Sequence, residues 1–325
     1  MSRVLVTGGA GTIGSAVVRR LLSDSQWDVR VADHREAPQW MREGCEIRTA
    51  DLRIPEAAGA AIHGCSQVIH LAAIVGGIAN FHKLPFTLFG VNNALTGALT
   101  QAAVGHDVER FVYVSSSMVF ERATEFPTTE EHVDSCPAPR SAYGFSKLAG
   151  EIYTRAANEE HGLRYTICRP FNAYGPGELP EPDEPGIAHA VPDLIHKALT
   201  GRRPLEIFGA GTQTRTITHV DDIADGIVTA MASPAGENED FNVSASEELT
   251  VAELAEIIWE ACGNEPGQFE LAHLPSFAVD VQRRWPSVEK ARRLLGWEAT
   301  VDLRDGIAQT VAWLREQEAA GAVSQ

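Results

Sequence analysis

Residues 4–14 read VLVTGGAGTIG, a short apolar run that leads directly into a glycine-rich turn. The aliphatic residues of the run predict a buried strand, and residues 12–23 have the spacing of a helix. In such a turn Gly8 permits the tight bend, Gly11 lets the backbone approach a pyrophosphate, and Gly14 lets the helix pack closely on the strand. Because the N–H groups and the positive dipole end of the helix then face the phosphates, the stretch predicts a dinucleotide-binding unit.

The same alternation of strand and helix continues along the first half of the chain. Further apolar runs predict strands at 29–33, 46–51, 67–73, 110–115 and 164–170, and segments with helical spacing lie between most of them, such as 86–104 and 141–161. Alternating strands and helices indicate right-handed βαβ units and a parallel sheet. The predicted fold class is therefore α/β, with a Rossmann-type doubly wound parallel sheet.

Asp33 ends the second predicted strand, about 20 residues beyond the glycine turn, where a carboxylate binds the hydroxyls of the adenosine ribose. An acid at this position repels a 2′-phosphate, so the sequence favours NAD over NADP. Arg35 weakens this inference, since a nearby arginine accommodates such a phosphate. Asp51 and Leu52 close the third predicted strand and either border the adenine or form a solvent-facing strand end.

From residue 171 the pattern changes, because a loop rich in proline and glycine is followed by mixed short strands and helices. Helices are predicted at 190–199, 250–262, 287–295 and 303–317, and 218–231 resembles a strand end that leads into a helix. We therefore expect an NAD-binding Rossmann domain at 1–170, to which 216–245 returns. A smaller C-terminal α/β substrate-binding lobe would consist of 171–215 and 246–325.

Composition narrows the class of protein. The 325 residues carry a formal net charge of −17, which argues against a broad basic surface for nucleic acid. No apolar run approaches the length of a membrane span, and the N-terminus enters a strand without a cleavable leader. The five cysteines (45, 65, 136, 168 and 262) have no CxxC or paired spacing. They predict no metal site and are interpreted as reduced thiols of a cytoplasmic protein.

Tyr143 and Lys147 lie in the segment YGFSK, inside a predicted helix, where the i to i+4 spacing puts both side chains on one face. A tyrosine is a poor base at neutral pH, since its pKa is near 10. A neighbouring ammonium and a positive nicotinamide ring would favour the phenolate. A serine hydroxyl from residues 115–117, at the end of a predicted strand, could share the same substrate oxygen. Although an exposed helix face is the common reading of such spacing, the context here favours catalysis.

With these motifs the chain resembles the extended short-chain dehydrogenase/reductase family, which contains the nucleotide-sugar epimerases and dehydratases. The resemblance covers nearly the whole chain, and the matching motifs occur in order: TGGAGTIG (7–14), Asp33, HLAA (70–73), SSS (115–117), YGFSK (143–147), RPFNAYGPG (169–177), GAGTQTRTITHVDD (209–222) and RRWPSVEKARRLLGW (283–297). It implies reversible oxidation at C4 of a nucleotide-linked sugar by a tightly held NAD.

The resemblance also implies roles for individual residues. Tyr143 would be the base at the C4 hydroxyl, Lys147 would hold the nicotinamide ribose and lower the pKa of the tyrosine, and Ser116 would bind the same sugar oxygen. Asn92 would support the helix that carries both. The implied cofactor contacts are Gly8, Gly11, Thr12, Ile13, Gly14, Asp33, Asp51, Leu52, Leu71, Ala72, Ala73, Tyr143, Lys147 and Pro170. The implied substrate contacts are Gly76, Gly77, Ser117, Tyr143 and, at the diphosphate, Asn172, Arg215 and Arg284. Arginine suits a diphosphate because its planar fork donates two hydrogen bonds at once.

The identity of residue 118, a methionine, bears on which reaction of the family the chain catalyses. Dehydratases, decarboxylases and 3,5-epimerases of the family place a carboxylate or a cysteine near this position to move a further proton, whereas a thioether neither gives nor takes one. By elimination the sequence predicts a 4-epimerase, unless Glu121 or Cys136 supplies the missing group. The segment AAIVGGIANF (72–81) points the other way, because it resembles the Gly-Gly loop of GDP-sugar epimerase-reductases and GDP-mannose 3,5-epimerases.

Several alternatives stay open at this point. The nucleotide of the substrate stays open between UDP, GDP and another nucleotide. Glu178-Leu179 in place of an arginine favours a neutral sugar over a uronate. A 4-keto reductase or a non-catalytic NAD-binding protein are the other readings. Segments 86–104 and 141–161 have apolar positions to spare, so we expect either a homodimer through a four-helix contact or burial of these helices within the monomer.

Overall fold

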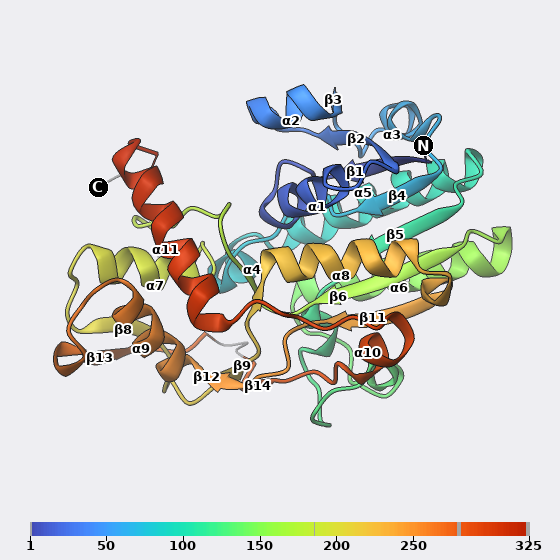
Figure 1. Ribbon diagram of the computed structural model, residues 1–325. Helices are drawn as coiled ribbons and strands as arrows, with labels where there is room; N and C mark the ends of the chain where they lie inside the picture. The colour runs from blue at the N-terminus through green and yellow to red at the C-terminus, as the bar shows by residue number, and fades with distance from the viewer. Residues whose placement is uncertain (1, 185, 278–280, 323–325) are drawn as a thin grey trace.

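A seven-stranded parallel sheet forms the centre of the protein, whose computed structural model describes residues 2–184, 186–277 and 281–322. The strand order is β11-β6-β5-β4-β1-β2-β3 (Figure 1). These strands are β1 Ser2–Thr7, β2 Trp27–Asp33, β3 Glu46–Thr49, β4 Gln67–His70, β5 Arg110–Val114, β6 Tyr165–Pro170 and β11 Glu239–Val243. Because β1 pairs with β2 on one side and β4 on the other, the order reverses beside β1. Ligands bind at the carboxyl ends of the strands beside such a reversal. The predicted Rossmann-type fold is confirmed.

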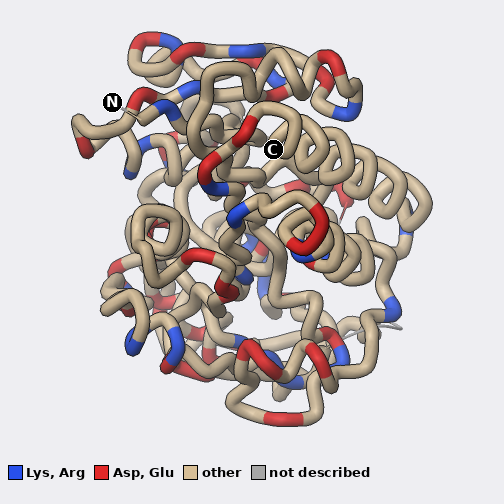
Figure 2. The backbone as a smooth tube through the Cα atoms, turned by 90° about the vertical axis from the view of Figure 1, so that its right-hand side faces the viewer, with Lys and Arg blue, Asp and Glu red and all other residues tan. Residues whose placement is uncertain are grey.

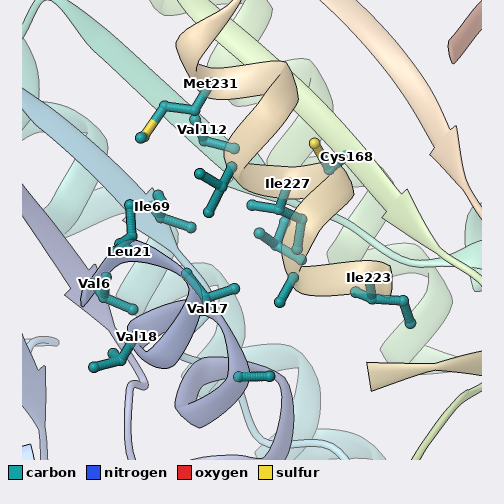
Figure 3. Close-up of a cluster of buried hydrophobic side chains, with 14 of the residues drawn as sticks. Val6, Val17, Val18, Leu21, Ile69, Val112, Cys168, Ile223, Ile227 and Met231 are labelled. Carbon is teal, nitrogen blue, oxygen red and sulfur yellow. The ribbon is translucent and has the colours of Figure 1, made fainter. Parts of the chain in front are cut away.

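Helices cover both faces of the sheet. On one face pack α1 (Thr12–Leu22) and α8 (Val220–Ala232), with α3 (Pro55–Ile62), α5 (Pro85–Gly105) and α6 (Ala142–His161) on the other. Successive side chains of β1 point to opposite faces of the sheet. Val4 and Val6 pack in the apolar cluster with α1 and α8, and Leu5 packs in the cluster on the other face. Figure 3 shows residues of α1, such as Val17 and Leu21, and of α8, such as Ile223 and Ile227, in one cluster with residues of the strands. The sheet is therefore buried on both faces, as its continuous apolar runs predict.

A second group of elements packs around its own apolar cluster. It contains α7 (Ala190–Leu199), α9 (Val251–Ala261), α11 (Leu303–Ala319), β8 (Leu205–Phe208) and β13 (Leu271–Leu274), and it lies to the left of the large sheet in Figure 1. Short strands border it: β7 Ala173–Tyr174 with β10 Thr218–His219, and β9 Thr214–Arg215 between β12 Leu249–Thr250 and β14 Arg283–Arg284. The remaining helices are α2 Gln39–Gly44, α4 Ile78–Lys83 and α10 Glu289–Leu295.

The chain returns to the large sheet after its first passage through the second group. Helix α8 packs beside α1, and β11 pairs in parallel with β6. Residues 220–232 and 239–243 therefore pack with the large sheet. The division into an NAD-binding domain and a nucleotide-sugar-binding lobe at the residues named above stays a prediction.

Two strands are shorter than their apolar runs suggest. Strand β3 ends at Thr49 and β4 ends at His70, so Asp51 and Leu71–Ala73 belong to loops at the carboxyl edge of the sheet. Hydrophobicity does not mark these ends, because the residues beyond them line the internal cavity described below. Apolar side chains are needed there whether or not the backbone stays in the sheet.

Charged residues of both signs are interspersed along the chain in the view of Figure 2. Within residues 2–184, 186–277 and 281–322, helices long and apolar enough to cross a membrane are absent.

Candidate active site

A cavity of about 1010 Å³ runs along the carboxyl ends of the central strands and continues between them and the second group of elements. It is large for a small-molecule site, whose usual range is about 300–1,000 Å³. All but one of the residues predicted from the sequence line it: Gly8, Gly11, Thr12, Ile13, Gly14, Asp33, Asp51, Leu52, Leu71, Ala72, Ala73, Gly76, Gly77, Ser116, Ser117, Tyr143, Lys147, Pro170, Asn172, Arg215 and Arg284. Asn92 lies behind the wall. The fold thus brings together motifs that are spread over nearly the whole chain.

The glycine turn forms one end of the cavity. Helix α1 begins at Thr12, and Gly11 before it provides no side-chain cap, so the first N–H groups of the helix stay available to a ligand. A Cβ atom on Gly14 would overlap the Gly8 carbonyl oxygen, and Gly8 itself has φ +72°. The backbone is therefore bare and tightly folded where a pyrophosphate would approach, which fits a dinucleotide.

Asp33 lies beside this turn with 4 % of its side chain exposed. Its carboxylate accepts hydrogen bonds from the Ala10 N–H at 3.0 Å and the Arg35 N–H at 3.0 Å, and pairs with the Arg35 guanidinium at 3.2 Å. Burial opposes the charged form, but the hydrogen bonds from Arg35 outweigh it and hold the pKa of Asp33 below its ordinary value. Since Arg35 is already engaged by Asp33, the anionic carboxylate dominates this end of the cavity.

Tyr143 and Lys147 face the middle of the cavity from the first turns of α6, whose start is fixed by Ser141 accepting the Gly144 N–H at 3.1 Å. Each is only 6 % exposed. Burial raises the pKa of Tyr143 to about 12, although its hydrogen bond with Ser116 and the positive charge of Arg284 act in the opposite direction. Burial lowers the pKa of Lys147 to about 8. Without a further positive charge Tyr143 is therefore a phenol, and a cationic ring beside it would favour the phenolate.

Asn92 ties the loop after β4 to α6. Its side-chain oxygen accepts the Ile74 N–H at 2.8 Å, and its amide donates to the Ile74 carbonyl at 3.1 Å and to the Ser146 hydroxyl at 3.4 Å. Ser146 in turn donates to the Tyr143 carbonyl at 2.7 Å. Asn92 thus reaches the helix of Tyr143 through Ser146, from behind the cavity wall.

Arg215 and Arg284 lie opposite each other on the paired strands β9 and β14 and line the far side of the cavity. Arg284 donates to the Asn172 side-chain oxygen at 2.9 Å, while the Asn172 amide donates to the Thr216 carbonyl at 2.8 Å. A second guanidinium nitrogen of Arg284 lies 2.9 Å from the Met118 sulfur. Asn172 and Met118 therefore orient one arginine of this pair.

Neither alternative acid–base residue of the sequence analysis lines the cavity. Glu121 accepts the backbone N–H groups of Arg140 at 2.8 Å and Ser141 at 3.0 Å, just before α6 begins. Cys136 is half-buried, and burial raises the pKa of its thiol. A carboxylate near a helix start is favourable in its own right, so the position of Glu121 has a structural explanation.

The cavity contains an acid–base pair that sequence reasoning missed, Glu178 and His189. One carboxylate oxygen of Glu178 accepts the His189 N–H at 2.9 Å and lies 2.7 Å from its Nδ1. Burial would lower the pKa of His189, but the Glu178 carboxylate raises it above the ordinary value. The two residues are 11 positions apart in a segment rich in proline and glycine, and no periodic pattern in the sequence predicts the pair.

The Gly-Gly loop holds the histidine segment in place. The Gly77 N–H donates to the Ile187 carbonyl at 2.5 Å, and a Cβ on Gly77 would overlap the carbonyl oxygens of Gly186 and Ala188. Phe81 follows on α4 and stacks on Tyr143 with ring centroids 5.0 Å apart. The glycines therefore have a packing role beside any contact with a ligand.

Comparisons with known proteins agree with this geometry. The model of the NAD dependent epimerase/dehydratase family matches residues 4–244. A UDP-glucose 4-epimerase of Mycolicibacterium smegmatis is 33 % identical over 97 % of this chain and 99 % of its own. GDP-mannose 3,5-epimerase 1 of Oryza sativa subsp. japonica is 29 % identical over 97 % of this chain and 82 % of its own. The structure of UDP-glucose 4-epimerase with UDP-glucose from Thermotoga maritima superposes with TM-score 0.86 and 29 % identity, covering 97 % of this chain and 99 % of that one.

The position of Asp33 predicts a preference for NAD over NADP. In differential scanning fluorimetry NAD should raise the melting temperature more than NADP, because the tighter ligand stabilises more. Asp33→Asn should narrow the difference between the rises in melting temperature with NAD and with NADP, because it removes the charge that repels a 2′-phosphate. Asp28→Asn, at the opposite end of the same strand, is the matched control and should leave it unchanged. Greater stabilisation of the unaltered protein by NADP would contradict the assignment.

Proposed function

Because the chain belongs to the NAD-dependent epimerase/dehydratase family, we propose that it inverts C4 of a nucleotide-diphosphate hexose. The observation that carries the proposal is the composition of the cavity wall. A buried tyrosine in contact with a serine, and a buried lysine, stand beside a dinucleotide cradle, and a methionine occupies the position of a further acid–base group. This part of the wall supports reversible oxidation at one carbon, because Met118 neither gives nor takes a proton.

The proposed reaction at C4 uses three side chains with different roles, those of Tyr143, Ser116 and Lys147. NAD, which the glycine turn would bind, would supply the hydride acceptor. Tyr143 takes the proton of the C4 hydroxyl while Ser116 donates a hydrogen bond to the same oxygen. Lys147 would bind the nicotinamide ribose, and its ammonium is kept in place by donating to the Val114 carbonyl at 2.9 Å. Phe81, stacked on Tyr143, excludes water from that side of the phenol.

Arg215 and Arg284 would bind the diphosphate. Their guanidinium groups come from neighbouring strands and face one cavity, which suits two linked phosphates. Asn172, assigned to the diphosphate from the sequence, acts in this proposal through Arg284, because both polar atoms of its side chain already have protein partners. Glu178 lines the cavity in place of the arginine that would favour a uronate, which supports a neutral hexose.

A 3,5-epimerase is the second candidate, because the Glu178–His189 pair and the rice relative both favour it. With Nδ1 engaged by Glu178, Nε2 of His189 is the ring nitrogen left for a ligand among the described residues. A histidine oriented by a carboxylate can move a proton at neutral pH. For that activity His189 would take the place of the residues suggested from sequence, Glu121 and Cys136.

The protein is proposed to act in the cytoplasm. Its five cysteines are all free thiols, including the buried Cys65, Cys168 and Cys262. Such unpaired cysteines are typical of a reducing compartment.

Replacing Tyr143 with Phe should reduce turnover of the nucleotide sugar by a factor of about 10²–10⁴ and leave its binding nearly intact, because the ring keeps its packing and loses only the hydroxyl. Steady-state kinetics and calorimetric titration with the same sugar measure the two effects. Tyr153→Phe, on the same helix but outside the cavity, is the control and should stay near the rate of the unaltered enzyme. A Tyr143→Phe enzyme of equal rate would remove Tyr143 from the mechanism.

Turnover in D₂O should give a C4-inverted product without deuterium at any carbon, because the hydride that leaves C4 returns to it and no carbon-bound proton meets solvent. The product is analysed by NMR and mass spectrometry after incubation with UDP- and GDP-hexoses. Deuterium at C3 or C5 would overturn the 4-epimerase proposal. If that label then disappears in His189→Asn and persists in Cys136→Ser, the 3,5-epimerase candidate takes its place.

An exposed apolar face on α5 and α6 supports the proposed homodimer. Phe86 and Ile152 are 89 % and 62 % exposed, and Phe89, Phe145 and Tyr153 are also exposed on these two helices. An apolar face shared by two adjacent helices is covered by the same face of a second copy when the contact is two-fold. The large exposure excludes the alternative that the described monomer buries these helices completely.

Light scattering at micromolar concentration should give the mass of a dimer. Ile152→Glu should shift the protein towards monomer, because two carboxylates would be buried across the two-fold axis. Ile54→Glu replaces another exposed isoleucine, 50 % exposed and before α3, and should leave the mass unchanged. A monomeric mass of the unaltered chain would refute the assembly.

A further inference from the structure

A buried ion pair lies directly behind the Tyr143–Lys147 helix. Arg169 of β6 is 0 % exposed, and its Nε and Nη2 atoms donate to the two carboxylate oxygens of Glu151 on α6 at 2.8 and 2.7 Å. Glu151 is 2 % exposed. Two parallel hydrogen bonds of this kind fix the carboxylate in orientation as well as in charge.

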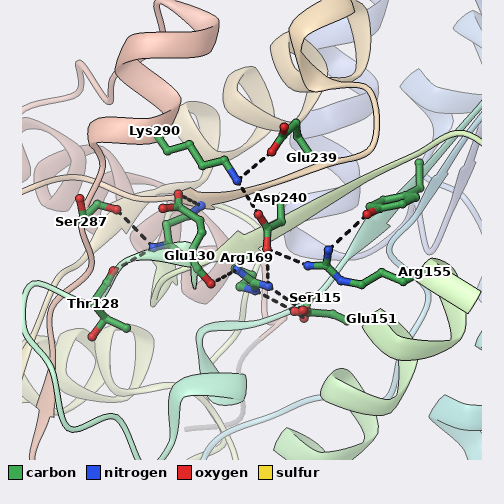
Figure 4. A network of polar contacts seen from close by, with 12 residues as sticks. Ser115, Thr128, Glu130, Glu151, Arg155, Arg169, Glu239, Asp240, Ser287 and Lys290 are labelled. Carbon is green, nitrogen blue, oxygen red and sulfur yellow. Dashed lines mark hydrogen bonds and ion pairs between the residues drawn. The ribbon is translucent and has the colours of Figure 1, made fainter. Parts of the chain in front are cut away.

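The pair belongs to a network that reaches the C-terminal segment (Figure 4). Arg169 also donates to Asp240 of β11 at 2.8 Å, and Asp240 in turn binds Arg155 at 2.8 Å and Lys290 of α10 at 2.6 Å. Glu151 and Asp240, the two carboxylates that Arg169 joins, therefore each have at least one cationic partner. The network holds helix α6 against the sheet through the Glu151–Arg169 pair, which is removed from water, and through the partly exposed Arg155.

Glu151 connects this network to the reacting groups. Its Oε1 atom accepts a hydrogen bond from the Ser115 hydroxyl, with the two oxygens 2.6 Å apart. Ser115 lies between Val114, whose carbonyl accepts the Lys147 ammonium, and Ser116, which binds Tyr143. Glu151 is also one helical turn beyond Lys147, on the same face of α6. One carboxylate thus contacts the strand end that both catalytic side chains use.

We propose that Glu151 is a positioning residue for the reaction, which keeps Lys147 protonated in the low-dielectric wall of the cavity and fixes the strand end at Ser115. The assignment rests on the proposed catalytic role of Lys147. Glu151 does not touch the cavity, so its effect is carried by its charge and by the Ser115 hydrogen bond.

The other groups that face Lys147 do not supply this charge. The Tyr113 ring of β5 lies 5.5 Å from Nζ, and burial raises the pKa of its hydroxyl far above the ordinary value. His70 of β4 is neutral, because burial and the nearby ammonium lower its pKa to about 3. Tyr143 on α6 is a phenol in the protein without its cofactor. Burial favours the neutral amine of Lys147, and the Glu151 carboxylate opposes it.

The lysines of this chain make a direct test practical, because there are four, Lys83, Lys147, Lys197 and Lys290. Labelling lysine with ¹³C at Cε gives one NMR signal for each, and Lys147→Arg identifies the signal of Lys147. The titration midpoint of that signal is followed in the full chain, with and without added NAD. No sugar is needed, so the result does not depend on which sugar, if any, the enzyme converts.

Glu151→Gln should lower the Lys147 midpoint by about one pH unit, because an adjacent negative charge is lost and Arg169 is left less compensated. Asp240→Asn is the matched control. It removes a carboxylate from the same network on the far side of Arg169, so it should reduce thermal stability comparably and leave the midpoint in place. The Glu151→Gln/Arg169→Gln double variant leaves no unpaired buried charge at this pair and is used if the single variant does not fold. It should show a smaller downward shift, because the positive charge of Arg169 is removed together with the negative charge of Glu151.

A Lys147 midpoint that stays constant in a folded Glu151→Gln or double variant would overturn the proposal and leave Glu151 a purely structural residue. An equal shift in Asp240→Asn would also overturn it, since the effect would then belong to the network as a whole. Failure of the proposed function has a different signature, in which the midpoint moves as expected and no nucleotide sugar is converted.

Discussion

The hydrogen bond from the buried Lys147 ammonium to the Val114 carbonyl is the interaction on which the site depends. It joins the catalytic helix to the carboxyl end of β5, at the edge of the sheet where the fold opens its cavity. From this fixed point the helical repeat places Tyr143 one turn before, against Ser116, and Glu151 one turn after, against Ser115. An ammonium in this wall is costly, and the carbonyl and the Glu151 charge offset part of that cost.

The elements that carry this arrangement could be predicted from the sequence because they follow short-range rules. The periods of the strands and helices predicted the doubly wound sheet. In the structure Val4 and Val6 pack on one face of this sheet and Leu5 packs on the other. The glycine turn and Asp33 follow the first two strands, so a sheet of this class presents them at one edge. The i to i+4 spacing of Tyr143 and Lys147 places both side chains on one face of a helix. Their meeting in one cavity follows from the strand order, in which the reversal beside β1 opens the crevice.

The interactions that could not be predicted join residues through irregular loops. His189 contacts Glu178, and its neighbours Gly186 and Ile187 accept hydrogen bonds from the N–H groups of Ala79 and Gly77. Met118 was interpreted as a missing acid–base group, yet it also contacts Arg284 and packs with Tyr143. No periodicity reports such long-range contacts, and strand ends such as His70 are hidden because the lining of the cavity is itself apolar.

In the proposed reaction Tyr143 and Ser116 meet the C4 oxygen of the sugar while Arg215 and Arg284 hold its diphosphate. A crystal structure of the Tyr143→Phe protein with NAD and a nucleotide hexose tests it most directly. We predict the C4 oxygen within about 3 Å of the Ser116 hydroxyl, with Arg215 and Arg284 on the phosphates. A sugar that presents C3 or C5 to Nε2 of His189, with C4 away from Ser116, would contradict the account.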